Sequence, residues 1–145
     1  MPTSVVDAYA GSGALAAALL RDGRRVTAIE LDPDASAVAG AALRGDPLSR
    51  VLTGRVEHML PYALPADLAV LNPPRAGVDP TVPPMLSAES SGVRRILYVS
   101  CDPATLARDI VRLGSAWTLT AVQGFDMFPQ TAHVETVCTL DRELA

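Results

Sequence analysis

One of the two cysteines stands where a nucleophile would be useful. Cys101 follows the strand-like run Arg95–Ser100 and comes two residues before Pro103, which opens a helical pattern. A thiol between a strand and the start of a helix faces the backbone N–H groups and the positive dipole end of that helix, and both favour the reactive thiolate. Cys138 lies inside an apolar run and is expected to be a buried, inert thiol. The same buried role is the alternative for Cys101.

A turn with two glycines and a later acidic residue indicate an adenosine ligand. Gly11 and Gly13 follow the first predicted strand, where glycine allows a backbone to approach a ligand closely before a helix begins. Glu30 ends the next predicted strand, about 20 residues further on, and is placed to accept hydrogen bonds from both ribose hydroxyls. The further glycine of the dinucleotide fingerprint is missing, which disfavours NAD. The alternatives are a steric turn and a surface glutamate.

A proline-rich turn follows the fourth predicted strand. Asn72 precedes Pro73, Pro74 and Arg75. The two prolines fix the backbone and hold the Asn72 side chain outward, over the reactive end of a bound cofactor. We therefore predict a catalytic loop at this point, with prolines that merely end a strand as the alternative.

These positions fall at strand ends in a doubly wound α/β pattern. Runs rich in β-branched residues alternate with stretches rich in alanine and leucine, as in βαβ units around a mostly parallel sheet. The predicted strands are residues 4–9, 25–31, 51–57, 67–71, 95–100, 117–124 and 133–140, and the predicted helices are residues 13–21, 33–43 and 103–113. No helical stretch separates the last two strands, so we expect an antiparallel hairpin. Residues 79–84 are expected to be irregular.

Composition and charge limit which kinds of partner the chain can bind. With 145 residues the chain is expected to form a single domain. A net charge of −4 argues against broad electrostatic adhesion to nucleic acid, so such binding would need a local arginine face or a second domain. The candidate arginines are Arg75, Arg94, Arg95, Arg108 and Arg112. No membrane span, secretory signal or metal-ligating cysteine spacing is present, and we expect a cytoplasmic location.

Three ordered segments resemble the RNA 5-methyluridine methyltransferase family. They are residues 71–77, residues 98–108 and residues 126–136, with residues 7–13 matching that family's first-strand motif. The resemblance covers essentially all 145 residues as the catalytic domain. It implies a Rossmann-like class I methyltransferase fold with a seven-stranded sheet, S-adenosylmethionine as cofactor and transfer or ribosomal RNA as partner. It also implies that the upstream RNA-binding part of the family is absent from this sequence.

The resemblance assigns roles to individual residues. Cys101 is the nucleophile and Glu135 the base, because a thiolate added at carbon 6 of uracil activates carbon 5, and a carboxylate must then remove the carbon 5 proton. The uridine has to be flipped out of its stack or lie in a single-stranded loop. The implied cofactor contacts are Tyr9, Gly11, Gly13, Glu30 and Asn72, the implied phosphate contacts are Arg75 and Arg108, and His133 is a neighbour of the base.

Two positions depart from the family pattern, and two other functions stay open. Asn72 stands where the family usually has aspartate, which removes an acceptor of charge-assisted hydrogen bonds from the cofactor site. Asp102 stands where the family usually has asparagine, and its charge opposes a thiolate at Cys101 unless it is turned away or paired. The alternatives are an amino-methyltransferase that uses the Asn72-Pro73-Pro74 turn, and a truncated cofactor-binding domain that needs a partner chain.

Overall fold

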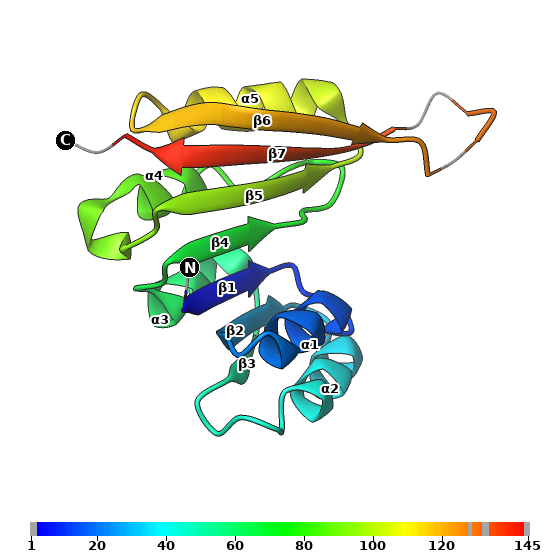
Figure 1. The fold of residues 1–145 in the computed structure, drawn as a ribbon, viewed down its shortest axis with the longest axis vertical. Coiled ribbons are helices and arrows are strands. Elements are labelled where there is room, and N and C mark those ends of the chain that lie inside the picture. The colour runs from blue at the N-terminus through cyan, green and yellow to red at the C-terminus, as the bar shows by residue number, and fades with distance from the viewer. Residues whose placement is uncertain (1–2, 128, 132–133, 144–145) are drawn as a thin grey trace.

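A single mixed sheet of seven strands forms the centre of the computed structural model, which describes residues 3–127, 129–131 and 134–143 (Figure 1). The strands run in the order β3-β2-β1-β4-β5-β7-β6. Their bounds are β1 Ser4–Ala8, β2 Arg25–Glu30, β3 Arg50–Thr53, β4 Leu68–Leu71, β5 Arg95–Ser100, β6 Trp117–Phe125 and β7 Glu135–Arg142. The first five pair in parallel, whereas β7 pairs antiparallel with both β5 and β6. The predicted fold class, strand number and closing hairpin are confirmed.

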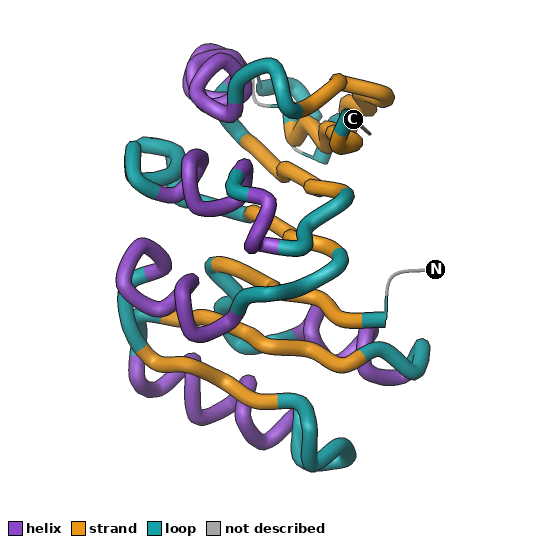
Figure 2. The backbone as a smooth tube through the Cα atoms, turned by 90° about the vertical axis from the view of Figure 1, so that its left-hand side faces the viewer, coloured by secondary structure: helices purple, strands orange, loops and turns teal. Residues whose placement is uncertain are grey.

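Helices cover the sheet on both faces, and Figure 2 shows the strands as one layer with the helices beside it. Their bounds are α1 Ala14–Arg21, α2 Pro33–Ala42, α3 Val56–Ala63, α4 Val82–Ser87 and α5 Pro103–Leu113, with the 3₁₀ turn η1 at Glu89–Ser91. Alternation along β2 separates two cores: Val26 and Ala28 pack with Ala16 of α1, while Ile29 packs in the larger core beneath α3, α4 and α5. Among the described residues no helix is long and apolar enough to cross a bilayer.

Two predicted segments are wrong. Residues 51–57 were expected to form one strand, but β3 ends at Thr53 and α3 begins at Val56. Residues 79–84 were expected to be irregular, but α4 begins at Val82. Both helices contain proline, a residue that usually ends a helix. Pro61 lies inside α3, and prolines stand in the first turn of α4, where a missing N–H costs nothing. The final strand begins at Glu135 instead of His133, which lies outside the described residues.

Candidate active site at the carboxyl ends of the strands

A cavity of about 630 Å³ opens at the carboxyl ends of the parallel strands. This volume lies in the range of small-molecule sites, and this edge of an open α/β sheet is where ligands bind. Its walls come from the ends of β1, β2 and β3, the loop after β4, and α5. The lining residues are Tyr9, Ile29, Glu30, Leu31, Gly54, Arg55, Val56, Glu57, Pro74, Ala76, Gly77, Val78, Asp79, Pro80, Arg108 and Arg112.

Sequence reasoning missed part of this lining. Tyr9, Glu30 and Arg108 were predicted as site residues, but residues 54–57, which end β3 and begin α3, were not, because they were predicted to continue a strand. Gly54 directly after the β-branched run was the available signal, since glycine commonly ends a strand in a turn. Gly11, Gly13 and Asn72 do not line the cavity.

Glu30 ties the loops after β1 and β2 together. Its Oε2 accepts a hydrogen bond from the Gly11 N–H at 2.7 Å, and its Oε1 accepts from the Asp32 N–H at 2.9 Å. A carboxylate offers about four acceptor sites, so each oxygen keeps capacity for a hydroxyl donor in the cavity. The geometry fits the predicted role of Glu30 as an acceptor for a vicinal diol.

The end of β1 carries backbone strain and a buried carboxylate. Tyr9 has φ 63°, a left-handed conformation that non-glycine residues rarely adopt and that clusters at functional sites. Asp7 is 1% exposed, and its Oδ2 has no hydrogen-bond partner among the described residues. Burial, and then the nearby Glu30 carboxylate, raise the pKa of Asp7 to about 7. An orphaned buried acceptor beside a ligand loop is the mark of a missing donor.

Glycine is needed at positions 11 and 13 of this loop for different physical reasons. Gly13 is the N-cap of α1 at φ 84°, and a Cβ there would lie 2.8 Å from the Cα and Cβ of Ala39 in α2. Gly13 therefore permits close helix packing. A Cβ at Gly11 would meet nothing within 4 Å, and its φ of 58° is left-handed. The open space above Gly11 is where a ligand could approach the backbone.

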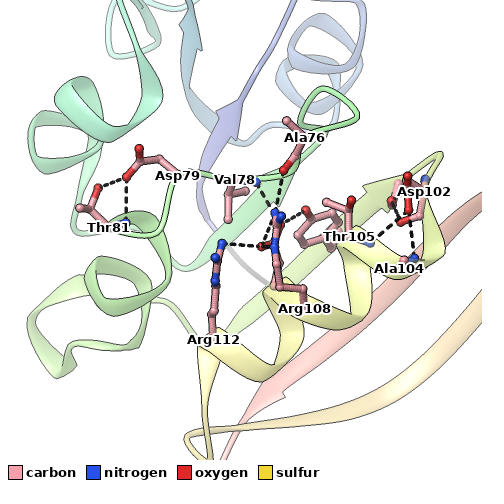
Figure 3. A network of polar contacts seen from close by, with 12 residues as sticks. Ala76, Val78, Asp79, Thr81, Asp102, Ala104, Thr105, Arg108 and Arg112 are labelled. Atoms are coloured by element: carbon pink, nitrogen blue, oxygen red, sulfur yellow. Dashed lines mark hydrogen bonds and ion pairs between the residues drawn. The ribbon is translucent and has the colours of Figure 1, made fainter.

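The loop after β4 is held from α5. The buried carboxylate of Asp109 accepts the Val78 N–H at 3.0 Å, and Arg108 Nη2 donates to the Ala76 carbonyl at 2.6 Å (Figure 3). Arg108, predicted as a phosphate contact, is thus engaged in shaping this loop. Asn72 is exposed, and its backbone N–H reaches the carbonyl of Ala8 at 3.5 Å, so the residue follows β4 directly beside the end of β1.

The register of β5 and β7 points to Cys101 and Glu135 as neighbours. Ser100 and Thr136 are the last pair of this antiparallel ladder, and extending its register by one residue would set residue 101 opposite residue 135. Opposite residues have Cα atoms about 5 Å apart and side chains on one face. Both side chains are partly exposed, and neither lines the cavity. They lie one strand beyond the loop after β4. Cys138 is buried at 1% exposure, as predicted.

Asp102 caps α5 instead of opposing the sulfur. Its Oδ1 accepts the N–H groups of Ala104 at 3.0 Å and Thr105 at 3.1 Å. These bonds, with the charge of Arg75 as a further cause, lower the pKa of Asp102 below its ordinary value. The expected opposition of the Asp102 charge to a Cys101 thiolate is relieved, because this carboxylate is paired with backbone N–H groups. The expectation that these helix N–H groups serve the Cys101 thiolate needs correction, because Asp102 occupies them.

The candidate arginine face is divided. Arg94 and Arg95 lie at the amino end of β5, where they pair with Asp67 at 3.4 Å and Asp141 at 2.6 Å. Cys101 follows the opposite end of the same strand. The cavity end keeps Arg75, Arg108 and Arg112. Among the described residues no group of three or more histidine, cysteine or acidic side chains could hold a metal ion.

Comparison with known proteins decides the family. Residues 61–143 match the family model described as tRNA (Uracil-5-)-methyltransferase. The chain belongs to this family. It is 46% identical over 143 residues to an uncharacterized RNA methyltransferase of Gloeobacter violaceus, and 38% identical over 151 residues to one of Geobacter sulfurreducens. These alignments cover 96% and 97% of this chain but 30% of each relative, so the chain spans about a third of their length.

A solved family structure has the same architecture. The Pyrococcus abyssi tRNA (uracil-54, C5)-methyltransferase, crystallised with S-adenosyl-L-homocysteine, superposes with a TM-score of 0.82 and 29% identity, over 94% of this chain and 33% of that one. Thermus thermophilus TrmN, at 20% identity and a TM-score of 0.71, shares the fold. The uracil-5 methyltransferase family model spans both Cys101 and Glu135, whereas Tyr9 and Glu30 precede the matched residues.

Proposed function

We propose that this chain is the catalytic domain of an RNA (uracil-C5-)-methyltransferase that acts through a covalent Cys101 adduct. The single observation that supports the proposal is the register of β5 and β7: its last pair, Ser100 with Thr136, is followed by the Cys101 thiol and preceded by the Glu135 carboxylate, at the end of the sheet where ligands bind. A nucleophile and a base on one face, one strand spacing apart, suit a reaction in which both must reach the same pyrimidine ring.

The cavity and the neighbouring loop after β1 fit S-adenosylmethionine. Glu30 offers acceptor sites for the ribose hydroxyls, and Gly11 leaves the loop after β1 open to a ligand. Bound there, the cofactor supplies an electrophilic methyl group on a sulfonium.

The reaction divides between the two opposed side chains. The Cys101 thiolate forms a bond to carbon 6 of the uracil, and the electrons of the carbon 5–carbon 6 double bond move onto the ring carbonyl. Carbon 5 then takes the methyl group, and the carbon–sulfonium bond breaks to leave a neutral thioether. Glu135 accepts the proton from carbon 5, the double bond forms again, and the Cys101–carbon 6 bond breaks to release the thiolate.

The target uridine must be unstacked to meet Cys101 and Glu135. RNA binding is proposed to combine Arg75 and Arg108 at this end of the sheet with a further RNA-binding domain or chain. The net charge of −4 supports the second contribution, because phosphate contacts made by so few arginines give weak, salt-sensitive binding.

Exchanging each cysteine tests the nucleophile, and Cys138→Ala is the matched control. The 145-residue chain is incubated with labelled S-adenosylmethionine and unmodified tRNA or ribosomal RNA transcripts, and nucleosides are read by mass spectrometry. Cys101→Ala should abolish 5-methyluridine while cofactor binding by calorimetry persists; Cys138→Ala should keep both. Turnover by Cys101→Ala near the parent rate would refute the proposal, and N-methylated nucleosides in place of 5-methyluridine would favour the amino-methyltransferase alternative. Methylation that begins only when an RNA-binding partner is added supports the divided RNA site.

A further inference from the structure

The carboxylate of Asp109 is the most heavily engaged buried group at this end of the molecule. It is 1% exposed in the middle of α5. Its Oδ2 accepts the Tyr98 hydroxyl at 2.6 Å and the Val78 N–H at 3.0 Å. Its Oδ1 faces Arg108 at 3.1 Å and Arg112 at 3.4 Å. The two arginines and two neutral donors satisfy a charge that would otherwise be costly to bury.

These contacts join segments that are distant in the sequence. Val78 belongs to the loop after β4, Tyr98 to β5, and both arginines to α5. Arg108 donates onward to the Ala76 carbonyl at 2.6 Å, so the loop is held at two backbone positions (Figure 3). Burial, and then the bond to Asp109, raise the pKa of Tyr98 above its ordinary value, which keeps its hydroxyl a donor.

The loop lies so close to α5 that residue 77 must be glycine. A Cβ at Gly77 would collide with the Asp109 carboxylate, the Arg108 guanidinium and the Thr105 methyl group. Gly77 also has φ 81°, which disfavours a side chain on backbone grounds. The loop after β4 therefore cannot move relative to α5 without breaking the Asp109 contacts.

The segments that Asp109 joins lie at the cavity proposed for the methyl donor and next to the proposed nucleophile, Cys101. Ala76, Gly77 and Val78 line the cavity proposed for the methyl donor. Tyr98 lies in β5, three residues before Cys101, and α5 begins two residues after Cys101. Asp109 therefore links the wall of the cavity to the strand and the helix that flank Cys101.

We infer that Asp109 is a positioning residue, which fixes the loop after β4 against β5 and α5 and thereby sets the methyl donor at its reacting distance from the pyrimidine held by Cys101. The inference rests on the proposed function. It assigns Asp109 no contact with cofactor or RNA. Misplacement of reacting atoms by about 1 Å can cost 100-fold in rate, so a loosened loop should affect methyl transfer far more than either binding or adduct formation.

The test compares Asp109→Asn with Asp141→Asn, a matched control whose carboxylate bonds Arg95 and Thr120 at the other end of β5 and β7. Single-turnover methyl transfer should fall about 100-fold in Asp109→Asn, with cofactor affinity and the rate of covalent RNA adduct formation changed less than about tenfold. Asp141→Asn should leave all three near the parent values. A parent transfer rate in folded Asp109→Asn would overturn the inference, as would equal losses in all three quantities.

Two further variants cover a failure of Asp109→Asn to fold. Tyr98→Phe removes one bond to the carboxylate, and Gly77→Ala pushes the loop away while Asp109 stays intact. Both should slow methyl transfer selectively, and parent rates in both would overturn the inference.

If the parent chain binds S-adenosylmethionine but methylates no RNA, the proposed function fails while the positioning role is still decided by hydrogen exchange. The Val78 amide should exchange at least about tenfold faster in Asp109→Asn, or in Tyr98→Phe where the first variant does not fold, and not in Asp141→Asn. Unchanged protection of Val78 would refute the role of Asp109.

Discussion

Replacing Asp7 by asparagine should change how the stability of the ligand-free protein depends on pH. The carboxyl has a pKa of about 7 in the folded state and an ordinary value of 3.8. Between these values the folded state keeps a proton that the unfolded state has lost, so the free energy of unfolding falls as pH rises from about 4 to about 7. The resulting destabilisation is on the order of 4 kcal/mol by pH 8. Asparagine does not titrate, so the variant lacks this loss.

The assay is a pair of thermal melts across pH, without ligand. A chain of this length shifts its Tm by roughly 3 °C for each kcal/mol, so the Tm of Asp7→Asn relative to the parent should rise by about 10 °C between pH 4.5 and pH 8. The change with pH is diagnostic, because other carboxylates titrate equally in both proteins. A Tm difference that stays constant over this pH range would refute the reasoning.

Three further substitutions test the surrounding structure. Gly13→Ala should destabilise the fold by about 1–3 kcal/mol in urea unfolding, because its Cβ would lie 2.8 Å from Ala39 at a left-handed φ; unchanged stability would contradict the packing role. Arg142→Met should cost about 2–4 kcal/mol in the same assay, since its guanidinium donates to several carbonyls of the α4–β5 connection and stacks 4.7 Å from the Trp117 ring. Glu30→Gln should weaken cofactor binding about 10–100-fold in calorimetry with stability lowered by only about 1 kcal/mol, and equal affinities would exclude Glu30 from the ribose site.

The number of strands and the closing hairpin could be predicted because most strands are short apolar runs bounded by glycine, proline or polar residues. The segments that failed, α3 and α4, contain prolines at positions where only the three-dimensional context shows that they are tolerated. Pro61 lies in an eight-residue helix whose Val56 and Leu60 are buried, so packing outweighs the local cost of the proline. Local signals cannot report that balance.

The site was predictable to the extent that it follows strand ends. Glu30 was located because an acidic residue at a strand end, about 20 residues after a glycine turn, carries a local signal, whereas Tyr9 was implied by the family resemblance alone. Asp109 carried none, because a carboxylate between two arginines on an amphipathic helix reads as a solvated face. Its burial depends on the loop and strand that close over it. The opposition of Cys101 and Glu135 is likewise non-local, since it depends on the β5–β7 register, which the resemblance implied but the spacing alone did not specify.

Trapping of the covalent intermediate tests the Cys101–Glu135 pair most directly. Glu135→Gln is incubated with S-adenosylmethionine and uridine-containing tRNA and ribosomal RNA transcripts, then run on a denaturing gel beside Glu143→Gln, which changes a carboxylate at the other end of the same hairpin. A slower protein–RNA band should accumulate in Glu135→Gln alone and disappear when Cys101 is also replaced by alanine, because methyl transfer proceeds without release. Turnover by Glu135→Gln at the parent rate, with no such band, would contradict the account.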